Sequence, residues 1–136
     1  MIQKAIDKFI SNKDKLFNEK LPESYSDIFK SVIDLIKDEY DNDLNFDSNR
    51  ITMIDHGDYQ GNQLFIIACD DYQPSNYWWV DVSYGSCSGC DTFQNIIEKI
   101  SFKDKDDEDY FETLEEVKKE LRVLALHMVQ KLKVLE

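Results

Sequence analysis

The sequence predicts one α+β domain over residues 1–136: two N-terminal helices, a three-stranded antiparallel meander, and two C-terminal helices packed on the sheet. Three observations support this fold class. Apolar residues recur at helical spacing toward both ends of the chain. The middle instead holds extended runs rich in aromatic and β-branched residues. Only short polar segments join these runs, which favours antiparallel neighbours.

The first helix is expected over residues 2–19 and the second from about residue 25 to residue 40. Pro22 separates them, because proline cannot continue a helix. The polar segment 41–49 is expected to be a loop. The apolar face of the second helix is predicted to hold Tyr25, Ile28, Phe29, Val32, Ile33, Ile36 and Tyr40.

The three strands are expected over residues 50–56, 64–69 and 77–84. Gly61 suits the turn between the first two strands, because glycine adopts positive φ at little steric cost. Side chains alternate along a strand. On the third strand, one face is therefore predicted to carry Trp78, Val80, Val82 and Tyr84. The other face is predicted to carry Tyr77, Trp79, Asp81 and Ser83.

A short helix is expected after Asp91, which is followed three residues later by Gln94, the spacing of a capping box. The last helix is expected over residues 110–134. Between Val123 and Val129 only His127 is polar, so this part is expected to be buried on nearly all sides.

The chain carries 16 basic and 28 acidic residues, a net charge of −12. This charge works against binding nucleic-acid phosphates or an anionic membrane surface, and favours either a basic partner or solubility alone. There is no apolar run near the ~20 residues of a membrane span and no signal-peptide pattern. The three cysteines are an odd number, and a secreted disulfide framework would normally use an even one. We therefore expect a cytoplasmic protein with reduced thiols.

The densest concentration of Gly, Ser and Cys lies between the third strand and the third helix. A candidate ligand- or partner-binding loop is formed by Tyr84, Gly85, Ser86, Cys87, Ser88, Gly89 and Cys90. Cys87 and Cys90 have the Cys-x-x-Cys spacing that can hold zinc. The meander topology brings His56 near this loop, so one hypothesis is a zinc site formed by Cys87, Cys90, His56 and His127.

Other interpretations of this loop remain open. A redox dithiol is disfavoured, because Asp91 would raise the thiol pKa and the expected sheet is antiparallel. A backbone nest could hold an anion at the helix N-terminus, although Asp91 again opposes it. In the simplest interpretation, the cysteines are small buried apolar residues of a structural loop.

Two weaker candidates lie on the strands. Asp55 and His56, with Cys87, could form a small hydrolase-like catalytic set, although a polar strand end explains Asp55 and His56 as well. Tyr77 and Trp79 would suit a protein interface if they are exposed. The sequence has no P-loop, dinucleotide fingerprint or serine-nucleophile elbow.

Three segments, HGDYQG (56–61), YGSCSGCDT (84–92) and LALHMVQKLK (124–133), resemble a group of small bacteriophage and mobile-element proteins without an assigned activity. The resemblance implies a phage-type accessory protein that acts in the bacterial cytoplasm. Together with the acidic charge, it leads us to expect a non-enzymatic protein that binds a host macromolecule with a basic surface, as an inhibitor or nucleic-acid mimic. The alternatives are a zinc- or small-ligand-binding domain centred on Cys87 and Cys90, and an enzyme.

Overall fold

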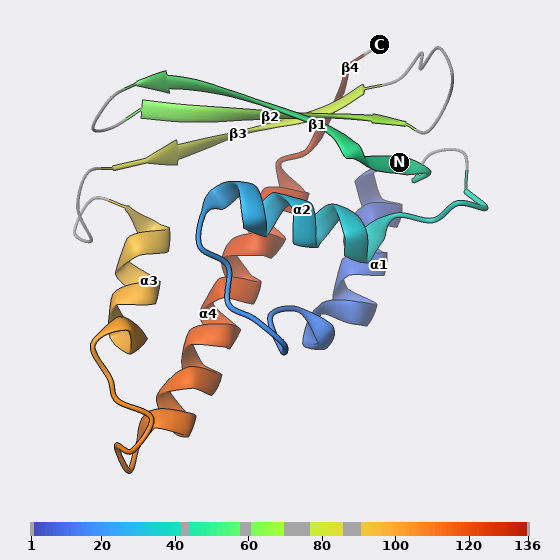
Figure 1. Ribbon diagram of the computed structural model, residues 1–136. Coiled ribbons are helices and arrows are strands. Elements are labelled where there is room, and N and C mark those ends of the chain that lie inside the picture. Colours follow the sequence, from blue (N-terminus) through green and yellow to red (C-terminus); the bar gives the residue numbers. More distant parts are fainter. Residues whose placement is uncertain (1, 42–43, 58–60, 70–76, 86–90, 136) are drawn as a thin grey trace.

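In the computed structural model, four helices lie on one side of a four-stranded sheet (Figure 1). The structure describes residues 2–41, 44–57, 61–69, 77–85 and 91–135. The order of its elements is α1 (Ile2–Asn12), a 3-10 turn (Lys13–Lys15), α2 (Tyr25–Ile36), β1 (Phe46–Gly57), β2 (Gly61–Cys69), β3 (Tyr77–Tyr84), α3 (Thr92–Ser101), α4 (Tyr110–Gln130) and β4 (Lys133–Leu135).

The predicted antiparallel meander is confirmed, but the sheet has a fourth strand that the sequence did not predict. The order is β1-β2-β3-β4, and each neighbouring pair is antiparallel. The expected last helix stops at Gln130, where the Lys131 amide donates to His127 and Met128 carbonyls. Pairing with Tyr77–Trp79 then makes Lys133–Leu135 a strand. Three residues are too few for a period-two pattern to reveal a strand.

The first helix ends at Asn12, earlier than predicted, and side chains donate hydrogen bonds at its end and in the segment that follows. The Asn12 side-chain amide donates to the Lys8 carbonyl at 2.9 Å. The Arg122 guanidinium, from α4, donates to the Asp14 and Leu16 carbonyls at 3.1 and 3.0 Å. Phe17 then adopts φ 63°, which turns the chain back toward α2.

The core lies between the inner face of the sheet and the helices. The alternation predicted for β3 is confirmed, since Trp78 and Val80 are buried while Tyr77 and Trp79 are only partly buried on the outer face. Phe65 packs against Phe29 of α2 in an edge-to-face contact with 5.1 Å between ring centroids. All four helices lie on this inner side of the sheet, and no described helix lies over its outer face (Figure 1).

Helix α4 is amphipathic, contrary to the expected burial around its C-terminal half. Val123 and His127 are exposed. The helix lies between the sheet and solvent, so only one stripe of it is covered. The buried residues of α4 are Val117, Leu121, Ala125, Met128 and Val129. Among the described helices, none is both long and apolar enough to cross a membrane.

Candidate functional site

The strand-to-helix connection is anchored by a buried carboxylate. Asp91 is only 4% exposed and caps α3 by accepting from the Gln94 amide at 3.0 Å. Its second oxygen accepts from the Gly85 amide at 2.9 Å, so the two ends of the connection are joined. Residues 86–90, which include the candidate residues Ser86, Cys87, Ser88, Gly89 and Cys90, lie outside the described part of the chain.

Asp91 caps α3 as predicted, but the Gln94 side chain does not make the hydrogen bond expected of a capping box. The Gln94 side chain donates to the Gly85 carbonyl at 2.8 Å instead of reaching back to the Asp91 amide. The Tyr25 hydroxyl donates to Asp91 at 2.9 Å and accepts from the Phe93 amide at 3.2 Å. Burial is the main cause of the raised pKa of Tyr25, and the hydrogen bond to Asp91 adds to it. The described part of this site is therefore a structural clamp.

The described members of the proposed zinc set lie apart. Tyr84 pairs with Gly61, which pairs with Gly57, so the end of β3 lies beside the strand end that carries His56. His56 pairs with Asn62 and is on the outer face of the sheet, whereas His127 belongs to α4 beneath the inner face. Among the described residues, no group of three or more His, Cys, Asp or Glu side chains could hold a metal. The zinc site stays a prediction.

The two polar residues of the hypothetical catalytic set also point in different directions. Asp55 pairs with Gln63 and accepts from the Gln63 amide and the Tyr84 hydroxyl. The adjacent His56 points to the opposite face, because neighbouring side chains alternate along β1. Asp55 and His56, the described members of this set, therefore do not face a common site.

Tyr77 and Trp79 form part of the uncovered outer face. The Trp79 ring lies 4.9 Å from the Lys133 ammonium of β4, a cation–π contact. Ile66 and Leu64 of β2 continue this face, opposite Trp79 and Asp81. The face is apolar at its centre and polar toward the end that carries Asp81 and Ser83.

A second feature lies at the end of the molecule farthest from the sheet, where α3 joins α4 (Figure 1). We call residues 102–116 the acidic tip. It contains eight acidic residues and two lysines, a net charge of −6, which is half that of the chain. Two aromatic side chains project from it, with Phe102 86% and Phe111 70% exposed. Exposed aromatic rings among charges are typical of interface anchors.

Hydrogen bonds and an ion pair hold the acidic tip in place. The Asp107 amide donates to the Asp104 carbonyl and the Tyr110 amide to the Asp107 carbonyl, which form two successive turns. The Lys103 ammonium lies 2.7 Å from the Asp109 carboxylate, and this hydrogen bond raises the pKa of Lys103 and lowers that of Asp109.

An open cavity of about 440 Å³, the α3 cavity, lies next to Phe102. Its apolar walls are Phe93, Ile97 and Phe102, and two carboxylates, Glu23 and Glu98, stand beside them. Such a cavity fits a long cationic side chain, whose methylene groups can pack on the rings while its charge meets the carboxylates.

Comparison with known proteins gives this chain no family: no family model, curated protein or solved structure matches it. Reasoning from sequence missed the α3 cavity, although its residues were visible. Phe102 falls directly after the apolar stripe of the short helix, where an aromatic residue has no core to enter. An acidic run alone is typical of a solvated loop, so it does not by itself indicate the exposed rings of Phe102 and Phe111 beside it.

Proposed function

We propose that this chain is a non-enzymatic accessory protein that binds a basic host macromolecule through the acidic tip and the α3 cavity. The observation that carries the proposal is the α3 cavity, where an apolar floor that includes the exposed Phe102 lies beside two carboxylates. The chemistry complementary to this site is a protein surface that presents arginine or lysine.

The charge distribution supports the same partner. The acidic residues are gathered, since residues 102–116 carry half of the net charge. A concentrated negative field accelerates encounter with a positively charged surface. The apolar contact at Phe102 would then slow dissociation, since hot spots are apolar or aromatic anchors surrounded by weaker polar contacts.

The resemblance to bacteriophage proteins suggests that the partner belongs to a bacterial host. A host surface that normally holds nucleic acid carries the required arginines and lysines, so occupying it would inhibit that host protein. In this proposal the acidic tip takes the place of phosphates, and Phe102 takes the place of a stacked base.

The proposal can be tested by affinity capture from bacterial lysate. We expect a captured protein that is lost with Phe102→Ser and with Glu98→Lys, and that is released by salt between about 0.05 and 0.5 M because screening weakens the charge contacts. If that protein binds nucleic acid, added duplex DNA should compete with the chain.

Val123→Ser is the matched control, because Val123 is also an exposed apolar side chain but lies outside the acidic tip and the α3 cavity. Circular dichroism and urea unfolding should show that all three variants fold like the wild type. A captured set that is identical for wild type, Phe102→Ser and Glu98→Lys would contradict the proposal, as would the capture of no protein.

A further inference from the structure

Strand β3 has an edge that β4 covers only in part. Strand β4 pairs with Tyr77–Trp79 and comes directly from the end of α4. Residues 80–83 of β3 pair with β2 on one side, and no described strand pairs with them on the other. Alternate residues of this stretch therefore present backbone N–H and C=O groups to the open edge, where they can pair with another chain.

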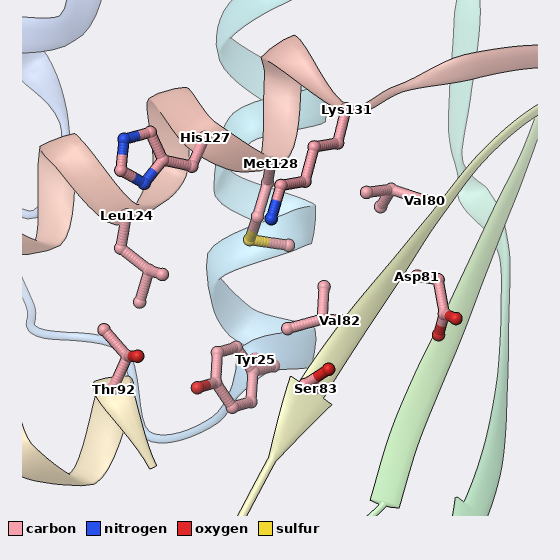
Figure 2. Close-up of a pocket in the computed structure, with 10 residues that line it drawn as sticks. All are labelled: Tyr25, Val80, Asp81, Val82, Ser83, Thr92, Leu124, His127, Met128 and Lys131. Atoms are coloured by element: carbon pink, nitrogen blue, oxygen red, sulfur yellow. The ribbon is translucent and has the colours of Figure 1, made fainter. Parts of the chain in front are cut away.

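A cavity of about 220 Å³ follows this open edge, between β3 and the C-terminal part of α4 (Figure 2). Its apolar wall includes Val80 and Val82 of β3 with Leu124 and Met128 of α4. Tyr25 and Thr92 lie at the end nearest α3 (Figure 2). The volume suits one or two side chains from the inner face of an added strand, because alternate residues of a strand point to the same side.

The side chain of Lys131 lies beside this apolar wall. Figure 2 shows the Lys131 side chain extending from the end of α4 over Met128, while the Asp81 carboxylate points away from the cavity. Within the described ranges, the Lys131 ammonium has no hydrogen-bond or ion-pair partner. An unpaired lysine at an apolar cavity, in a chain of net charge −12, is complementary to a carboxylate.

We propose that the open edge of β3, residues 80–83, binds an extended segment of another protein by strand addition. The backbone of the segment would continue the sheet beyond the point where β4 ends. The segment would present two side chains on one face, two positions apart in its own sequence. The apolar one would enter the cavity, and the acidic one would contact the Lys131 ammonium. Main-chain pairing would provide affinity, and these two side chains would provide selectivity.

A displayed library of random ten-residue peptides tests this proposal without knowledge of the natural partner. We expect selected peptides to carry Asp or Glu two positions from an apolar residue and to lack proline within that stretch. Lys131→Glu should weaken their binding about tenfold, because attraction is replaced by repulsion. Lys119→Glu, the same charge change at an exposed position of α4 that does not line the cavity, should leave it unchanged.

Amide hydrogen exchange locates the bound peptide. Added peptide should slow the exchange of alternate amides within residues 80–83, and those of β1 should not respond. The proposal is overturned if no peptide is enriched, if Lys131→Glu and Lys119→Glu bind alike, or if exchange at β3 does not change. Sedimentation showing that the free chain is a dimer with these amides already protected would assign the edge to a second copy, which also overturns it.

Discussion

The Tyr25 hydroxyl donates a hydrogen bond of 2.9 Å to the Asp91 carboxylate, although 66 residues separate the two in sequence. Tyr25 begins α2 and Asp91 caps α3, so this bond ties the N-termini of two helices together under the end of β3. Asp91 also accepts from the Gly85 amide, and Gly85 is the last described residue before the segment 86–90. The clamp therefore holds together Gly85 and Asp91, the two described ends of the connection between β3 and α3.

Removing the Tyr25 hydroxyl should destabilise the fold. In Tyr25→Phe the ring can still pack against Phe93, but Asp91 loses one donor and the Phe93 amide loses its acceptor. We expect the free energy of unfolding to fall by about 2 kcal/mol, because buried polar groups lose their partners. Urea unfolding measures this. Tyr40→Phe is the matched control: Tyr40 is 91% exposed, so a loss as large as that of Tyr25→Phe would show that the clamp is unimportant.

The raised pKa of the Tyr25 hydroxyl leads us to expect a loss of stability at alkaline pH. Burial raises the pKa of Tyr25 above its ordinary value of 10.0. Below pH 10.0 the hydroxyl is protonated in the folded and unfolded chains. Above it the unfolded chain releases the proton while the folded chain keeps it, so stability falls with rising pH. The difference in unfolding free energy between wild type and Tyr25→Phe should therefore shrink by up to ~1.4 kcal/mol per pH unit above 10.0. A constant difference would contradict this.

Asp91 should contribute more to the free energy of unfolding than an ordinary helix cap does. Asp91→Ala leaves the Gly85 and Gln94 amides and the Tyr25 hydroxyl without their acceptor, and we expect a loss of about 3 kcal/mol in urea unfolding. Ser24 provides the comparison, because it caps α2 at an exposed position with one bond to the Asp27 amide. Ser24→Ala should lose only about 1 kcal/mol. Equal losses would mean that burial adds nothing to the Asp91 cap.

Local patterns in the sequence were sufficient to predict most of the elements. The alternation along β3 correctly predicted that Trp78 and Trp79 lie on opposite faces, and the spacing of Asp91 and Gln94 correctly predicted the α3 cap. These features depend on residues a few positions apart. The fourth strand depends on pairing between Val134 and Trp78, which are distant in sequence, so no local pattern predicts it.

The sites were harder to predict than the fold for the same reason. Glu23 and Glu98 flank one cavity only because α2 and α3 begin side by side. Lys131 meets the open edge of β3 only because α4 packs beneath the sheet. A sequence motif such as Cys-x-x-Cys is visible because its members are adjacent, whereas these two sites are assembled by tertiary packing and carry no motif.

Arg122 gives a final prediction about the fold. Its guanidinium donates to the Asp14 and Leu16 carbonyls and to the Asn18 side chain, so it holds the segment that follows α1 against α4. Arg122→Lys keeps the charge but loses the planar group that reaches several acceptors. We expect a loss of about 1–2 kcal/mol in urea unfolding and faster amide exchange within residues 13–18. Lys119→Ala, on the exposed surface of the same helix, should change neither measurement. Unchanged exchange in Arg122→Lys would show that the turn at Phe17 is held by its own packing instead.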